Sequence, residues 1–395
     1  MKYLTHVIIL LFAFCSCQSK KDNKNYPIET ITLNLNKKIE FLFTDFIEID
    51  TIIHLETNDS SLISGIRKLY FTKTYLYVFD RMQKQILQFK RNGEFKRKIG
   101  INGIGPAEYI RPLDFCVSEK FNKIAVLEDI KRITIYDLNG KFIEKIKLPY
   151  YFNKIEIVSD KTFICVAYNR PQDYGKKNAF IVNSKGKVLY SGLPYEEYLV
   201  GLNRSLDNCI TRFDNQLNII RAFDDTIYTI RNNHINPKYY LDFGKDKLST
   251  EFVKELVSKK GQNNLRQISS ELTSSKYVSR ISRFSETKNY IYIGFKQNNN
   301  FYSLYYSKKT SEIKLYNHNN LHDFFFFLSP LASFKDDTFI NVVYPYNLYL
   351  ETNKFRLDYL KRNNNELYEY VKKIKEGIKP AENPVIVLTK IKKTF

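Results

Sequence analysis

The sequence has no tryptophan, two methionines and five cysteines in 395 residues. Two cysteines lie near the start, and the others are Cys116, Cys165 and Cys209. An odd, sparse set of three does not make a disulfide framework, even in an oxidising compartment. Cys116 and Cys165 each lie inside an apolar run, so we expect them to be buried as small hydrophobic residues.

Long hydrophobic runs are also lacking. The run Val7–Phe14 is well short of the roughly 20 apolar residues that a transmembrane helix needs. Because it follows the basic Lys2, it is typical of a signal peptide, which is set aside before the fold is considered. The tetrad Phe324–Phe327 is shorter still and is interpreted as a buried strand. The sequence therefore predicts export and no membrane-spanning helix.

The end of this signal resembles a bacterial lipobox, in which a cysteine is diacylated and becomes the new N-terminus. Cys17 fits better than Cys15, because the small Ser16 precedes it whereas the bulky Phe14 precedes Cys15. We predict a lipoprotein signal peptide over residues 1–17, lipidation at Cys17 and a polar tether over residues 18–30. A secreted protein with two chance cysteines is the alternative.

A clustered basic segment is missing, although the formal net charge is +20. Lys and Arg are scattered in short groups, whereas a nucleic-acid footprint gathers on one face or helix. The abundance of Lys, Asn, Ile, Tyr and Phe indicates a coding bias, and export removes the chain from cytoplasmic DNA and RNA. We therefore predict no nucleic-acid partner, while a basic surface remains compatible with anionic envelope lipids or polysaccharide.

Signatures of catalysis are absent too, since there is no His-Glu-x-x-His, Gly-x-Ser-x-Gly, P-loop or dinucleotide motif. His318 and His322 stand four residues apart, a spacing that on a helix brings two imidazoles to one divalent metal. The turn-like segment 317–320 argues against a helix there. A divalent metal at these two histidines is the one cofactor hypothesis, and otherwise we predict none.

What the sequence does contain is a repeat. Phe89–Ile99 matches Tyr136–Ile146 with the two Asn-Gly turns 47 residues apart, and Phe180–Leu189 is a third copy. Asn-Gly between apolar alternations predicts a hairpin in which both turn residues have positive φ. Further strands precede the copies, so each unit is a four-stranded antiparallel meander of about 40–50 residues, the size of a propeller blade. These preceding strands are Tyr75–Phe79, Lys123–Leu127 and Thr162–Val166.

Three more units follow. The sequence therefore predicts an all-β fold, a six-bladed β-propeller over residues 31–395, with helical insertions at about 249–270 and 364–377. We expect this propeller to be monomeric. The fourth unit contains strands at 218–220, 225–230 and 239–241, the fifth spans 276–315, and the sixth combines 324–349 with 384–388. We expect the N-terminal strands at 31–35 and 47–55 to complete the sixth blade and so close the ring.

Gly103–Tyr109 resembles the G-x-G-P-G-E-Y signature of the six-bladed β-propeller lipoproteins of Bacteroides and relatives. Cys17, the strand end Tyr77–Asp80 and the hairpin Phe89–Phe95 are similar to that family as well, whereas Ala107 departs from its usual glycine. The resemblance implies export and the propeller, and it implies no established activity.

The loop that carries this motif is the candidate ligand site. Glu108 and Tyr109 offer a carboxylate and a stacking ring there, and Arg81 at a strand end is a further candidate. Turn chemistry alone explains the residue types of the loop, however, and favours a rigid connection over a binding role. We predict a binding or scaffold protein, lipid-anchored to the outer membrane on its periplasmic or outer side, whose ligand is a glycan, peptide or protein. The alternative is a propeller hydrolase or lyase with a site in the central channel, which His318 and His322 beside channel carboxylates would favour.

Overall fold

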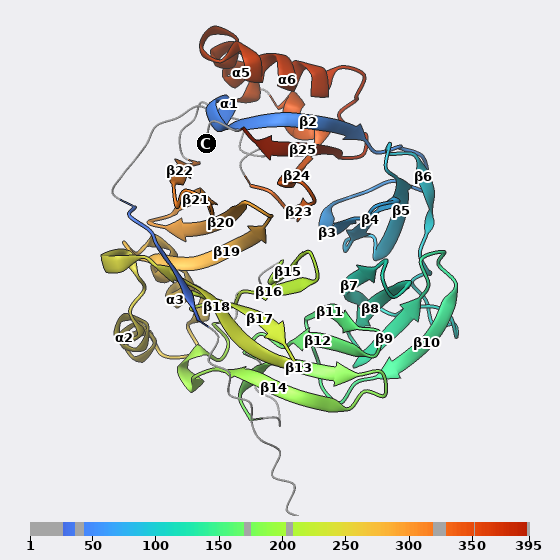
Figure 1. The fold of residues 1–395 in the computed structure, drawn as a ribbon, viewed down its shortest axis with the longest axis vertical. Helices are drawn as coiled ribbons and strands as arrows, with labels where there is room; N and C mark the ends of the chain where they lie inside the picture. Colours follow the sequence, from blue (N-terminus) through green and yellow to red (C-terminus); the bar gives the residue numbers. More distant parts are fainter. Residues whose placement is uncertain are drawn as a thin grey trace, which may run out of the picture.

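The computed structural model describes residues 27–35, 43–169, 175–202, 208–318, 329–350 and 352–392. Figure 1 shows antiparallel sheets set around a central axis, with few helices. The predicted signal peptide with Cys17, most of the tether, His322 and the tetrad 324–327 lie outside the described residues. Within them, no helix is both long enough and apolar enough to cross a membrane.

The three repeat copies form three four-stranded antiparallel sheets, as predicted, with consecutive strands as neighbours. Their bounds are β3 (Ile66–Phe71), β4 (Tyr75–Asp80), β5 (Gln85–Lys90) and β6 (Phe95–Lys98); β7 (Pro112–Ser118), β8 (Lys123–Glu128), β9 (Arg132–Tyr136) and β10 (Phe142–Lys147); and β11 (Lys154–Ser159), β12 (Thr162–Val166), β13 (Lys177–Asn183) and β14 (Val188–Pro194). Cys116 on β7 and Cys165 on β12 are buried free thiols, as expected.

The turns of the repeat differ from the prediction in one respect. Gly93, Gly140 and Gly186 have φ of 93°, 81° and 77°, but the asparagines of the two Asn-Gly turns do not have positive φ. A Cβ on Gly93 would stand 2.0 Å from the carbonyl oxygen of His54, and one on Gly186 the same distance from that of Lys147. Glycine is therefore needed both for its backbone conformation and because each outer hairpin touches the preceding sheet.

The other three sheets also follow the chain. The fourth contains β15 (Ile210–Phe213), β16 (Gln216–Ile219), β17 (Thr226–Arg231) and β18 (His234–Asp242); the fifth, β19 (Val278–Glu286), β20 (Tyr290–Gln297), β21 (Asn300–Ser307) and β22 (Ile313–Asn317); and the sixth, β23 (Ala332–Phe334), β24 (Thr338–Val343), β25 (Val385–Ile391) and β2 (Ile47–His54). The first strand of the fourth sheet, β15, was not among the predicted strands.

The two N-terminal strands go to different sheets. β2 pairs with β25, so the two ends of the chain share the sixth sheet, as predicted. β1 (Glu29–Thr32) was expected in the same sheet, but this is wrong: it pairs in parallel with β18 at the edge of the fourth sheet. The physical reason is burial, because Ile31 and Leu33 are 1% and 3% exposed in the core that the fourth sheet shares with its neighbours.

The first helical insertion consists of α2 (Thr250–Lys260) and α3 (Leu265–Ser274). Ser249 caps α2 by accepting a hydrogen bond from the Phe252 amide. The second insertion contains the expected α6 (Asn365–Lys375) together with α4 (Pro345–Tyr349) and α5 (Thr352–Asn363), which the sequence did not predict. Residues 345–349 were included in the sixth four-stranded unit but form a helix, and Pro345 at the first helical turn favours it. The short elements α1 (Phe43–Phe46), η1 (Glu197–Leu199) and η2 (Gly244–Asp246) complete the fold.

Candidate functional site: a cavity on the ring axis

A cavity of about 1010 Å³ opens where the strands nearest the axis end. Each sheet lines the cavity with its innermost strand or with the hairpin that follows that strand. The innermost strands are β3, β7, β11, β15, β19 and β23. The volume is at the upper end of the range common for small-molecule sites, roughly 300–1,000 Å³. One lining residue from each sheet, in chain order, is Tyr70, Phe121, Glu156, Arg212, Lys288 and Phe334.

The floor of the cavity contains a buried carboxylate held from two sides. Glu156 on β11 is 1% exposed. Its Oε2 accepts a short hydrogen bond from the Tyr70 hydroxyl of β3, and its Oε1 lies 3.2 Å from Nη2 of Arg212 on β15. The Arg212 side chain is 29% exposed and lines the cavity, so its guanidinium joins the buried acid to the open space.

A second charged layer lies two residues earlier on the inner strands. Nζ of Lys68 is 3.2 Å from Oδ2 of Asp114 and donates to the Phe115 carbonyl at 2.8 Å, and Nζ of Lys154 is 3.9 Å from Oδ1 of Asp114. Burial lowers the pKa of Lys68, but Asp114 and Glu156 outweigh it, and the net effect is a raised pKa. Burial lowers the pKa of Lys154, which Asp114 opposes only in part. Below the floor, charged groups thus bind the first three sheets together.

The walls are aromatic. Tyr70, Phe71, Phe121, Phe213 and Phe334 all line the cavity, and they come from four sheets. The Phe71 and Phe334 rings meet edge to face with centroids 5.1 Å apart. Ring faces and edges of this kind bind flat apolar surfaces in preferred geometries.

The mouth is formed by hairpins that carry exposed lysines. Lys73, Lys120, Lys288 and Lys335 line it, and none of them forms a salt bridge with another described residue. The neighbouring Glu119 is engaged: both of its carboxylate oxygens accept from the Lys73 backbone amide at 3.1 Å. In total six cationic and four acidic side chains line the cavity, which leaves a net charge of +2.

The residues predicted for ligand binding do not line this cavity. Tyr109 is 1% exposed and packs edge to face on Tyr136, and burial raises the pKa of its phenol. Glu108 accepts a hydrogen bond from the Gly105 amide at 2.8 Å, within its own loop. Arg81 is exposed in the turn between β4 and β5. These contacts support the rigid-connection interpretation of the loop, and its role in binding stays a prediction.

His318 lies apart from the cavity as well. Its Nε2 is 2.8 Å from the Ser303 hydroxyl, and its ring contacts those of Phe301 and Tyr316. Burial, aided by the positive charge of Arg283, lowers the pKa of His318 to about 3. His322, its predicted partner, is outside the described residues, among which no three His, Cys, Asp or Glu side chains are placed to hold a metal.

The cavity residues were missed because the sequence does not say which strand of each sheet lies innermost. A signal was nevertheless present. Lys68 and Tyr70 alternate along β3, as Lys154 and Glu156 do along β11, and strongly polar residues interrupt strands whose other members are apolar. In a strand covered on both faces, such residues need partners from neighbouring strands.

Comparison with known proteins places the chain in a family. The profile described as "Domain of unknown function (DUF4934)" matches residues 28–390. The chain belongs to the DUF4934 family. No curated protein sequence matches this DUF4934 chain.

Two solved structures share the fold of this DUF4934 chain. A Bacteroides fragilis NCTC 9343 protein described as exported has a TM-score of 0.74 at 18% identity, covering 93% of this chain and 100% of its own. A DUF4221 family member from Bacteroides vulgatus ATCC 8482 has a TM-score of 0.51 at 12% identity, covering 88% and 99%. At these identities the likeness shows the fold, a propeller-like ring of four-stranded antiparallel sheets.

Proposed function

We propose that this chain is an exported, lipid-anchored six-bladed β-propeller that binds its ligand in the axial cavity. The six sheets supply the blades, and β2 beside β25 supplies the closure that a ring needs. The lipobox-like Cys17 and the description of the Bacteroides fragilis relative as exported support an envelope location. The protein acts there as a binding or scaffold component for a glycan, peptide or protein.

The observation that carries this proposal is the cavity itself. Every sheet contributes to a space of about 1010 Å³ that combines aromatic walls with lysines at its mouth that form no salt bridge with another described residue. Ligand sites are concave, largely preformed and lined by apolar groups with a few polar ones placed among them. Because the residues that line the cavity come from all six sheets, the whole ring holds its geometry.

One observation favours the alternative, a hydrolase or lyase. Tyr70 and Glu156 place a hydroxyl and a carboxylate in hydrogen-bond contact at the cavity floor, with Arg212 beside them. Such a pair is suited to proton transfer. Against it, His318 does not line the cavity, and Glu156 is already held by an ion pair, so binding is the function that the geometry supports better.

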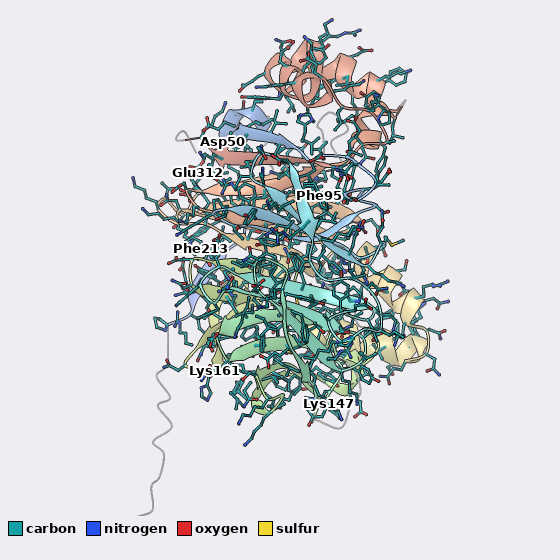
Figure 2. All side chains as sticks on the ribbon, turned by 90° about the vertical axis from the view of Figure 1, so that its right-hand side faces the viewer. Asp50, Phe95, Lys147, Lys161, Phe213 and Glu312 are labelled. Atoms are coloured by element: carbon teal, nitrogen blue, oxygen red, sulfur yellow. The ribbon has the colours of Figure 1, made fainter. Side chains whose placement is uncertain are left out.

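A thermal-shift screen of the purified protein tests the proposal with saccharides, peptides and divalent metals. A ligand that prefers the native state raises the melting temperature, by mass action. We expect a hit whose shift is lost in Phe213→Ala, on the cavity wall, and kept in Phe95→Ala, a half-buried ring on the outer strand β6. Figure 2 labels both rings, Phe213 at the left-hand face and Phe95 near the middle of the view.

Each of two other outcomes contradicts it. A ligand shift that survives Phe213→Ala but disappears in a variant of Arg81 or Glu108 would move the site to the outer loops. Turnover of a bound saccharide, abolished by Tyr70→Phe, would make the chain an enzyme.

A further inference from the structure

Lysines surround the cavity on nearly all sides. The hairpins that follow the innermost strands carry an exposed lysine in five of the six sheets. Figure 2 shows Lys161 on the same left-hand face as Phe213. These lysines are Lys73, Lys120, Lys161, Lys288 and Lys335.

Acids in the same hairpins are largely committed to other partners. Asp337 accepts from the backbone amide and the side-chain amide of Asn289, at 2.8 and 2.6 Å, and thereby joins the sixth sheet to the fifth. Asp160 pairs with Lys123 at 2.7 Å, which joins the third sheet to the second. Glu119 is bound to the amide of Lys73. These three acids thus connect hairpins, while the ammonium groups of the mouth, with Asp214 and Asp336 among them, face solvent.

Arg212 extends the positive character to the floor. Its bonds to Glu156 and to the Ile157 carbonyl both use Nη2, so Nη1 is left for a ligand anion. The hydroxyl of Thr211, the preceding residue, is buried without a hydrogen-bond partner in the described structure. Leaving a buried polar group unsatisfied is costly, and a ligand that supplies the missing bond binds more favourably for it.

The remaining lining is suited to sugar rings. Aromatic faces pack on the C–H faces of pyranoses, and short hydroxyl and amide side chains exchange hydrogen bonds with sugar hydroxyls. Both kinds of group alternate around this cavity. The short polar residues are Thr72, Thr74, Ser118, Thr211, Asn215 and Ser333.

We propose that the axial cavity selects a polyanionic saccharide, a sugar chain whose rings carry carboxylate or sulfate groups; this rests on the binding function proposed above. The aromatic walls and short polar groups bind the rings, Arg212 receives an anion at the floor, and the hairpin lysines attract the chain outside. The lining carries a net charge of +2. An excess of positive charge within low-dielectric walls concentrates the field, which raises the rate of encounter with such a ligand.

Titration calorimetry on the purified full chain tests this with four probes of matched length: oligogalacturonate, a heparin-derived oligosaccharide, a neutral malto-oligosaccharide and oligoglutamate. We expect one or both anionic sugars to bind, and their relative affinities to tell carboxylate from sulfate. Raising the salt from about 0.1 M to about 1 M shortens the Debye length from about 10 Å to about 3 Å. The affinity is therefore expected to fall by about tenfold or more.

Matched variants separate the mouth from overall charge. The quadruple variant Lys73→Gln, Lys120→Gln, Lys288→Gln and Lys335→Gln changes only exposed side chains, and we expect it to weaken binding by about tenfold or more. The control replaces four exposed lysines on or beside outer strands and should bind as the parent does. These are Lys96, Lys98, Lys147 and Lys187, and Figure 2 labels Lys147 well away from Phe213.

Three outcomes overturn the inference. If the neutral sugar binds as tightly as the anionic ones, the cavity does not select for charge. If oligoglutamate binds more tightly than the anionic sugars, the cavity does not select for saccharides. In either case, loss of the observed binding in Phe213→Ala would still support the axial cavity as the binding site. If both quadruple variants lose the same affinity for the anionic sugars, binding depends on the net charge of the protein and not on the lysines at the mouth. If no probe binds in a way that depends on Phe213, and the wider screen is also silent, both proposals fail.

Discussion

At the scale of single residues, several buried or half-buried polar groups in this protein have partners from other strands. His318 is held by the Ser303 hydroxyl within an aromatic surround, and its lowered pKa shows that the neutral imidazole belongs to the folded state. This arrangement needs no metal to account for it. The histidine is thus better placed to make stability depend on pH than to act at the cavity.

We expect His318→Gln to make the protein less sensitive to acid. The folded pKa of about 3 lies below the ordinary value of 6.5, so between these values the unfolded chain binds a proton that the folded chain does not. Stability therefore falls as the pH drops below 6.5, by up to about 1.4 kcal/mol per pH unit from this group. From pH 7 to pH 5 the parent should lose about 2 kcal/mol more than the variant, measured by urea unfolding.

The exposed His54 on β2 supplies the control for this test. His54→Gln should keep the acid sensitivity of the parent. Parallel unfolding curves for the parent and His318→Gln at pH 5 and pH 7 would show that the histidine is protonated equally well in the folded state, and would contradict the argument.

At the scale of elements, ion pairs join neighbouring sheets in two environments. Lys68 on β3 reaches Asp114 on β7 and the Ile155 carbonyl on β11, and all three residues are buried. Lys123 and Asp160 join the second and third sheets at the exposed hairpins. Buried pairs are costly to break because one charge is left without a counter-charge, whereas exposed pairs contribute little.

Asp114→Asn should therefore destabilise the protein by about 3–5 kcal/mol, since it leaves Lys68 buried without its carboxylate. Asp160→Asn, matched in chemistry but exposed, should unfold almost as the parent does. Urea unfolding at pH 7 measures both. Equal effects of the two substitutions would show that the Lys68 ammonium is solvated by other groups.

The elements also show what the sequence could predict. The first three sheets were predictable because Gly93, Gly140 and Gly186 mark the same hairpin in each copy. The pairing of β1 was not, because an apolar strand near a terminus can be buried at several sheet edges and only tertiary packing chooses one. α5 was missed for a similar reason: Leu360 anchors it in the core, while Phe355 is 82% exposed, so its apolar residues do not mark a single face.

The residues of the cavity could not be predicted from the sequence for the same reason, because tertiary packing brings them together. Lys68, Glu156 and Arg212 come from three sheets, and their contacts are long-range. The motif at Gly103–Tyr109 was predicted as a candidate ligand site, yet Glu108 bonds within the loop and Tyr109 is buried in the core. Local sequence thus identified a structural connection, while the site depends on which strands face the axis.

At the scale of the whole molecule, the ring is closed by pairing the two ends of the chain. β25 lies between β2 and β24, with Val385, Ile386 and Val387 fully buried. Residues from about 47 to 391 are thereby held in one closed circuit, in which each sheet is covered by two neighbours. Because β2 and β25 come from opposite ends of the chain, their pairing makes unfolding of the sheets interdependent.

This closure predicts unequal effects of two truncations. A chain that ends at Pro384 lacks β25, so β2 loses the strand it pairs with, β24 keeps only β23, and the ring opens. We expect it to show no cooperative transition in differential scanning calorimetry. A chain that begins at Phe43 lacks only the edge strand β1 with Ile31 and Leu33, whose burial contributes about 1.5–3 kcal/mol each. It should melt cooperatively at a lower temperature.

A peptide of residues 384–392 provides the decisive addition, because it carries β25 alone. Added to the chain that ends at Pro384, it should restore the cooperative transition in proportion to its concentration, since it binds only the native arrangement of β2 and β24. A peptide of residues 177–185, which carries β13 from the third sheet, should not. If the chain without β25 melts cooperatively on its own, the sheets are stabilised pairwise by their neighbours and the closure adds little. The axial cavity would then depend on local contacts between adjacent sheets, and its walls would tolerate an open ring.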